Sequence, residues 1–138
     1  MITALTATML IHILRLHPGD DVKKSLEAFV HQKNLKAAVI VTAVGSLTEA
    51  NLRYANQPKA STIKGHFEVV SLTGTLGSTS VSHLHISVSD GSGKTFGGHL
   101  MDGSKVYTTL ELAVGEVQGK EFKRTLDKTY GYEELNVD

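Results

Sequence analysis

The sequence predicts an α+β fold in which one main α-helix packs against a mostly antiparallel β-sheet. Apolar residues recur at helical spacing in one stretch near the N-terminus, whereas most of the remaining chain consists of strand-like runs separated by turn-forming residues. The chain has 138 residues, of which 41% are hydrophobic, and this is enough apolar material for one core. We therefore expect a single domain over residues 1–138.

The N-terminal part is expected to form a strand, a turn and the helix. Residues 9–16 are a short apolar run with β-branched side chains, and the Pro-Gly pair at 18–19 is typical of a turn. Asp20 and Asp21 stand where an N-cap and a first-turn acid are favourable, and Asn34 is of a type that ends helices. The apolar face of this helix, which should span about four turns, consists of Val22, Leu26, Phe29 and Val30.

The rest of the chain is expected to form strands. Residues 37–44 are a continuous apolar run, which predicts a buried strand that ends at Gly45, and residues 47–54 are expected to be its exposed neighbour. After a loop around Pro58, breaks with Gly, Ser or Asp separate four predicted strands at 65–76, 81–89, 94–101 and 106–117. Residues 122–138 are expected to form a tail or a short edge element.

Composition excludes several classes of protein. Equal numbers of acidic and basic side chains, 14 of each, count against strong autonomous binding of nucleic acid, because neutralising phosphates requires a basic face. The absence of cysteine excludes disulfides, thiolate catalysis and cysteine-ligated metal centres within this chain. We expect no membrane association and a cytoplasmic location, with the nucleus as the alternative.

Histidine is the one unusually frequent residue, and three of the seven histidines are expected to share one face of a β-hairpin. His83 and His85 are two residues apart in a predicted strand, so they point to the same face. The break at 90–94 fits a three-residue loop whose last glycine is left-handed. Such a loop places His85 opposite His99 and His83 opposite Met101, whereas a two-residue loop would send His99 to the core.

Three neutral imidazoles with an open fourth position are typical of a catalytic or substrate-binding zinc site, and they also suit nickel, cobalt or iron. We therefore expect a divalent ion, zinc first among these metals, bound by His83, His85 and His99. Candidate acid–base partners are Glu68, His66 and Asp90. The alternative is that the three histidines are ordinary polar side chains on a solvated strand face.

Basic residues near the C-terminus form the nearest approach to a nucleic-acid patch. They are interspersed with acidic residues, so we expect a solvated face made of Lys120, Lys123, Arg124 and Lys128. Direct DNA binding is accordingly the least expected function of this chain.

Several motifs resemble the plants and prokaryotes conserved (PPC) domain. These motifs are RLHPGDDV at 15–22, VGSL at 44–47, GHFEVVSLTG at 65–74, HLH at 83–85 and GGHL at 97–100. Their order and spacing match the family over about residues 9–136. Because several independent motifs agree, the chain is identified as a member of this family.

The resemblance implies an α+β fold that assembles as a homotrimer. Plant members carry the domain behind AT-hook DNA-binding motifs, but the Arg-Gly-Arg-Pro core of an AT-hook does not occur in this sequence. Some members resemble metal binders through histidines that correspond to His83, His85 and His99. Two functions follow from the resemblance. The first is a trimeric metalloprotein whose metal lies near a subunit boundary and binds a small-molecule ligand or a protein partner. The second is a non-enzymatic module that docks proteins through loops such as residues 56–62.

Overall fold

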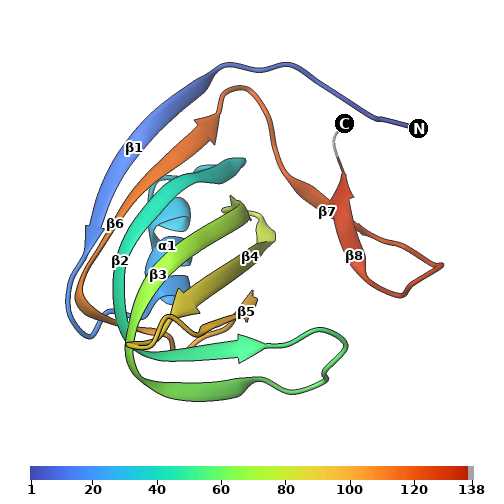
Figure 1. Cartoon of the computed structure of the whole chain (residues 1–138). Coiled ribbons are helices and arrows are strands. Elements are labelled where there is room, and N and C mark those ends of the chain that lie inside the picture. Colours follow the sequence, from blue (N-terminus) through green and yellow to red (C-terminus); the bar gives the residue numbers. More distant parts are fainter. Residues whose placement is uncertain (137–138) are drawn as a thin grey trace.

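A curved, six-stranded antiparallel sheet with a helix against one face dominates the structure (Figure 1). The computed structural model describes residues 1–136. Within this range the elements are β1 (Met9–Leu16), α1 (Val22–Gln32), β2 (Ala38–Arg53), β3 (Ser61–Gly77), β4 (Ser80–Ser89), β5 (Thr95–Leu100), β6 (Lys105–Val117), β7 (Lys123–Leu126) and β8 (Glu133–Asn136). The predicted α+β class is confirmed.

The strand order of the large sheet is β1-β6-β2-β3-β4-β5, and all of its pairings are antiparallel. The C-terminal end of β2 makes one further pairing, because Leu52 and Arg53 lie opposite Leu100 and His99 of β5. This pairing joins the last strand of the sheet back to β2. The β4–β5 hairpin is therefore held on two sides, by β3 and by the end of β2.

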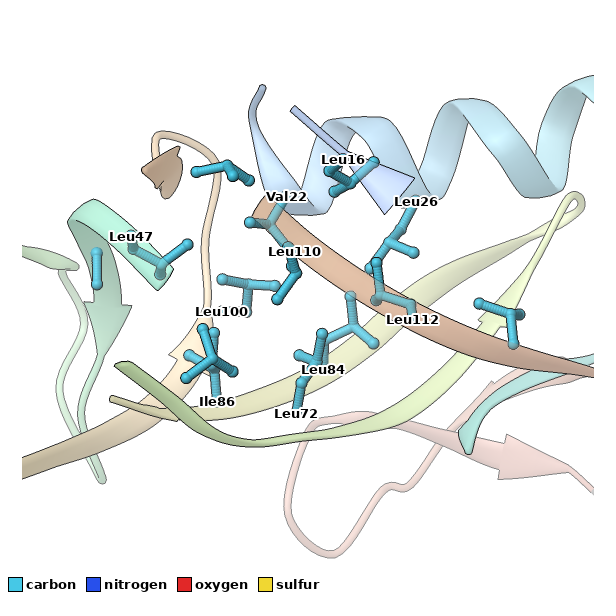
Figure 2. Close-up of a cluster of buried hydrophobic side chains, with 14 of the residues drawn as sticks. Leu16, Val22, Leu26, Leu47, Leu72, Leu84, Ile86, Leu100, Leu110 and Leu112 are labelled. Carbon is cyan, nitrogen blue, oxygen red and sulfur yellow. The ribbon is translucent and has the colours of Figure 1, made fainter. Parts of the chain in front are cut away.

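The core lies between α1 and the inner face of the sheet. Val22, Leu26 and Val30 recur at helical spacing and are at most 2% exposed, so they form the buried stripe of α1. Burial of each such side chain contributes about 1.5–3 kcal/mol. Figure 2 shows side chains of the helix meeting those of the sheet, among them Leu16, Leu72, Leu84, Ile86, Leu100, Leu110 and Leu112.

The helix-ending residue Asn34 is as predicted, but the prediction for the start is partly wrong, because α1 has no acidic residue in its first turn. Asp21 is the N-cap, and its side chain accepts a hydrogen bond from the backbone N–H of Lys24. Asn34 has a left-handed φ of 52°, and the N–H of Leu35 bonds back to the carbonyl oxygen of Val30, as in a helix-ending turn. The helix has 11 residues and therefore about three turns rather than the predicted four. Its last residue is Gln32, and Lys33 is the C-cap.

The predictions for residues 37–54 are partly wrong. Gly45 does not end a strand but lies inside the 16-residue strand β2. Its φ is 154°, and a Cβ at this position would collide with the carbonyl oxygen of Thr109 in β6, so glycine allows a close approach of the two strands. The expected burial is also reversed in part: Val44 is 60% exposed, whereas Leu47 and Leu52 are fully buried.

The four strands predicted between residues 65 and 117 are confirmed, although β3 begins earlier, at Ser61. The C-terminal segment forms a separate two-stranded sheet of β7 and β8 rather than a tail, and Figure 1 shows this hairpin to one side of the large sheet. Residues 137 and 138 of the predicted segment lie outside the described residues. In the part of the chain that the structure describes, no helix has the length and apolar character needed to cross a bilayer.

Asp21 links the start of α1 to the β5–β6 connection, and its removal should destabilise the fold. It is 8% exposed, accepts a hydrogen bond from the N–H of Gly103 at 2.7 Å and lies 3.6 Å from Nζ of Lys105. Asp21→Ala is expected to lower the free energy of unfolding, measured by urea denaturation, by about 1–3 kcal/mol. Asp20→Ala removes one exposed hydrogen bond to His17 and should cost less than about 1 kcal/mol; equal losses would contradict this account.

Candidate metal centre

The loop between β4 and β5 sets the register of the hairpin. The N–H of Asp90 donates to the carbonyl oxygen of Lys94, and the N–H of Gly93 donates to the carbonyl oxygen of Asp90, both at 2.9 Å. Gly93 has a φ of 82°, the left-handed conformation that the sequence predicts for it. The resulting ladder pairs His85 with His99, so the predicted register is confirmed.

The same ladder ends at the pair His85–His99, and the predicted pairing of His83 with Met101 is wrong. The N–H of Met101 instead donates to the carbonyl oxygen of Asn51 at 3.0 Å, because the chain after β5 follows β2. His83 still joins the other two histidines, since alternation along β4 places it on the same outward face as His85.

Three imidazole nitrogens converge on this face. Nε2 of His85 lies 3.2 Å from Nε2 of His83 and 3.1 Å from Nδ1 of His99, and the three nitrogens all lie within 4.8 Å of one another. The ring of His85 is edge-on to both other rings, which are nearly parallel with an interplanar angle of 16°. His83 and His85 are exposed and His99 is half-buried, so the nitrogens remain accessible from solvent.

The donor set fits a metal ion better than a hydrogen-bonded cluster. A neutral ring nitrogen carries either one proton or one lone pair in the ring plane, so it has one direction for a hydrogen bond. Nε2 of His85 nevertheless has two nitrogen neighbours within 3.2 Å. Nitrogens that bind one tetrahedral zinc at about 2.0–2.1 Å are separated by about 3.3 Å, close to the observed spacing. Three such ligands leave one tetrahedral position open.

Strand β3 forms one side of the candidate site. Thr73 and Thr75 pair with His85 and His83, and Gly74 lies between the two threonines with a φ of 142°. A Cβ on Gly74 would collide with the carbonyl oxygen of His83, so glycine permits the two strands to approach here. The same five residues line a surface hollow of about 140 Å³. Such a hollow has room for water and for a small ligand beside the histidines.

Burial and nearby positive charge favour the neutral form of two histidines. Burial is the main cause that lowers the pKa of His83, followed by the charges of His85, Arg124 and Arg53. Burial also lowers the pKa of His99, with Arg53 as the next cause. Metal ions bind the neutral imidazole, in which one ring nitrogen has a free lone pair, and the lowered pKa values of His83 and His99 favour this form.

Two arginines flank the cluster, and sequence reasoning identified neither as part of the site. Arg53 of β2 is the ladder partner of His99. Arg124 of β7 donates from Nη2 to Oγ1 of Thr75 at 2.9 Å and from Nε to the carbonyl oxygen of Val81 at 3.1 Å. The prediction of a solvated face is therefore wrong for Arg124, which is half-buried against β3 and β4. No local pattern signals this contact, because it joins residues more than 40 positions apart.

The acid–base candidates on β3 lie away from the cluster. Glu68 pairs with Ser89, which is four residues along β4 from His85, a distance of about 13 Å along a strand. The ring of His66 stacks on that of Tyr107 with 4.4 Å between the ring centroids. Both residues are exposed on the surface of the sheet.

The third candidate, Asp90, has a structural role in the hairpin loop. Its Oδ1 accepts hydrogen bonds from the N–H and hydroxyl of Ser92 and from the N–H of Lys94. The bonds from Ser92 are the main cause that holds the pKa of this exposed carboxyl below its usual value. The carboxylate therefore stabilises the loop that sets the position of His99.

A comparison with protein families identifies the relatives of this fold. The family model of the Plants and Prokaryotes Conserved (PCC, also written PPC) domain matches residues 5–118. The chain belongs to this family. The matched region of the PCC domain contains all three histidines of the cluster and ends before β7, so the hairpin that carries Arg124 lies outside it.

Individual relatives resemble nearly the whole of this chain. The chain is 39% identical over 133 residues to a protein named Bifunctional protein GlmU from Synechococcus sp. (strain JA-3-3Ab), covering 96% of this chain and 21% of that protein. The chain spans about a fifth of the length of this relative and of a second protein of the same name from another Synechococcus strain. A hypothetical protein from Salmonella enterica has a structure with a TM-score of 0.94 and 46% identity, covering 97% of this chain and 96% of that chain.

A second solved structure shares the fold at lower sequence identity. It is a metal-containing protein from Archaeoglobus fulgidus with a TM-score of 0.82 and 24% identity, covering 98% of this chain and 99% of that chain. The PCC fold is therefore common to bacterial and archaeal chains of very similar length.

Gly74→Ala should disturb both stability and the site, because the added methyl group meets the backbone of β4 at His83. We expect the free energy of unfolding in urea to fall by about 1–3 kcal/mol and the affinity for zinc to fall with it. Gly91→Ala is the matched control, since a Cβ on this loop glycine meets nothing within 4 Å. A Gly74→Ala variant with the stability and zinc affinity of the wild type would disprove the role of the close strand approach.

Proposed function

We propose that this PCC domain is a metal-binding protein in which His83, His85 and His99 hold one divalent ion, zinc in the first instance. The proposal depends on one observation above all: Nε2 of His85 lies within 3.2 Å of a nitrogen from each of the other two histidines. The donor set alone also suits nickel, cobalt and iron. A structural relative from Archaeoglobus fulgidus that is described as metal-containing gives further support.

The open position gives the proposed site its chemistry. A divalent ion held by His83, His85 and His99 would supply Lewis-acid chemistry there, namely a bound water with a pKa of about 7 or a polarised carbonyl or phosphoryl oxygen. The protein contributes rigid placement of the ligands on β4 and β5 and neutral imidazoles at His83 and His99. The hollow beside Thr73 and Thr75 supplies access for a small molecule.

Acid–base roles for Glu68, His66 and Asp90 stay predictions. Within one chain, none of the three joins the group of ligand atoms formed by the histidines. A large substrate or a neighbouring subunit would have to bridge the distance along β4 between Glu68 and the cluster. The metal-binding function does not depend on these residues.

Metal analysis of protein purified without a histidine tag or added metal tests the proposal. The wild type should carry about one divalent ion per chain, and His85→Ala should weaken zinc binding by more than about 100-fold, because loss of a direct ligand exceeds the 10- to 100-fold cost of changing an outer partner. His31→Ala, at an exposed histidine of α1, should bind as the wild type does. Metal content unchanged in the triple alanine variant of the cluster would favour the ordinary polar strand face instead.

We also propose that the domain assembles as a homotrimer, as its family resemblance implies. Three strands of the large sheet, β1, β2 and β3, carry large apolar side chains that are 49–79% exposed in the isolated chain, namely Ile11, Ile13, Val41, Val44 and Val70. Several exposed apolar side chains on one sheet are typical of an interface between protein chains. Burial of this face against two further copies would remove them from water.

Molar mass in solution tests the assembly. Light scattering of the wild type should give about three times the chain mass of 14.9 kDa, and Val44→Lys should shift the mass towards one chain, since burying an unpaired charge is costly. Leu126→Lys on β7 changes an equally exposed apolar residue outside the face and should leave the mass unchanged. A monomeric wild type would overturn the proposed trimer.

A further inference from the structure

We propose that Arg53 and Arg124 make the three-histidine cluster a site for a small oxyanion, either a carboxylate or a phosphate group. The inference rests on the proposed metal function, because the open position of the ion is where such a group would bind. It goes further by naming the chemical class of the ligand and the two residues that select it.

Arg53 is held on the histidine side of β2 by two strand contacts. Leu52 and Leu100 form the neighbouring ladder pair and are buried, so Arg53 and His99 share the opposite, outward face. Gly98 makes this arrangement possible, because a Cβ there would lie 2.8 Å from the carbonyl oxygen of Arg53. Within residues 1–136, the guanidinium group makes one hydrogen bond, a long one of 3.5 Å to the carbonyl oxygen of Gln57.

Arg124 approaches from the other side, across β3 and β4. Its contacts with Thr75 and Val81 bracket His83, the ladder partner of Thr75. A third hydrogen bond, of 3.4 Å, joins Nη1 to the carbonyl oxygen of Glu133. A guanidinium group has five N–H donors, so these three bonds to described residues leave two N–H groups for a ligand. The half-buried side chain is thus fixed in place and still able to donate.

The charge around the cluster is unbalanced. Among the described residues, neither arginine lies within 4.0 Å of a carboxylate, although surface arginines commonly find one. The positive charges of Arg124 and Arg53 both act on His83, and among the carboxylates of residues 1–136 the charge of Glu134 opposes them there. A divalent ion adds further positive charge. Arginine pairs of this kind bind the planar carboxylate or the phosphate group with charge-assisted hydrogen bonds.

The two arginines lie in different parts of the chain relative to the family model, and this difference concerns the specificity for the anion. Arg53 lies within the region that matches the family model, whereas Arg124 lies on the C-terminal hairpin beyond it. Attachment of β7 to β4 therefore adds a positive group that the matched region does not supply. The hairpin acts as a selectivity element for the ligand rather than as a part of the metal site.

NMR on the cobalt-loaded protein tests the inference with two anions. Binding of inorganic phosphate is followed by phosphorus NMR, and binding of acetate, the carboxylate probe, is followed by carbon NMR. Bound cobalt should broaden the signal of the anion that enters the site. Arg53→Gln and Arg124→Gln should each weaken binding of that anion by about tenfold or more, while metal content stays at the wild-type level. Arg15→Gln on β1 is the matched control and should change nothing, because Arg15 contacts Thr109 away from the cluster.

The outcomes separate the two proposals. Cobalt-loaded wild type that binds neither anion, or glutamine variants with wild-type affinity, would overturn the oxyanion inference and leave the metal site standing. Wild-type protein that binds no metal but binds phosphate through both arginines would overturn the metal site and support the arginine pair. Arg124→Lys keeps the positive charge but loses the planar guanidinium group, which can donate two parallel hydrogen bonds. An anion affinity between those of the wild type and Arg124→Gln would therefore support recognition by the guanidinium group over a general effect on folding.

Discussion

Strand β2 determines the architecture because it is hydrogen-bonded to three other strands. A strand has two edges, and β3 pairs along one of them over most of its length. The other edge is shared in succession: β6 pairs with residues 38 to 49, and β5 pairs with Leu52 and Arg53. Register shifts beside Ile40 and Gly45 bend the strand between these partners. A straight β2 would not bring β5 back to the sheet.

The candidate site is a consequence of this arrangement. Burial of Leu84 and Ile86 on the inner face pins the register of β4, since a slip by one residue would expose both and send His85 into the core. The β4–β5 loop then sets His99 opposite His85, and the end of β2 places Arg53 beside it. The histidine cluster is thus built on strands that are fixed by core packing, which is the kind of support that a precise ligand geometry needs.

Electrostatics distinguish this face from an ordinary polar strand surface. Nε2 of His85 lies within 3.2 Å of a nitrogen of each other histidine, and burial together with the nearby arginines lowers the pKa of His83 and His99. The surroundings therefore favour neutral imidazoles at His83 and His99, and the positive charge of the arginines favours an anionic ligand. In this chain the donors come from the region shared with the PCC family, while Arg124 comes from a hairpin outside it.

Local chemistry in the sequence determined the features that depend on neighbouring residues alone. Backbone preferences and strand alternation account for the N-cap Asp21, the helix-ending turn at Asn34, the left-handed Gly93 and the shared face of His83 and His85. Tertiary structure alone decided the passage of β2 through Gly45, the contact of Arg124 with Thr75 and the separation of Glu68 from the cluster. Alternation shows which way a side chain points, but long-range pairing decides which strands become neighbours, and no local pattern encodes that choice.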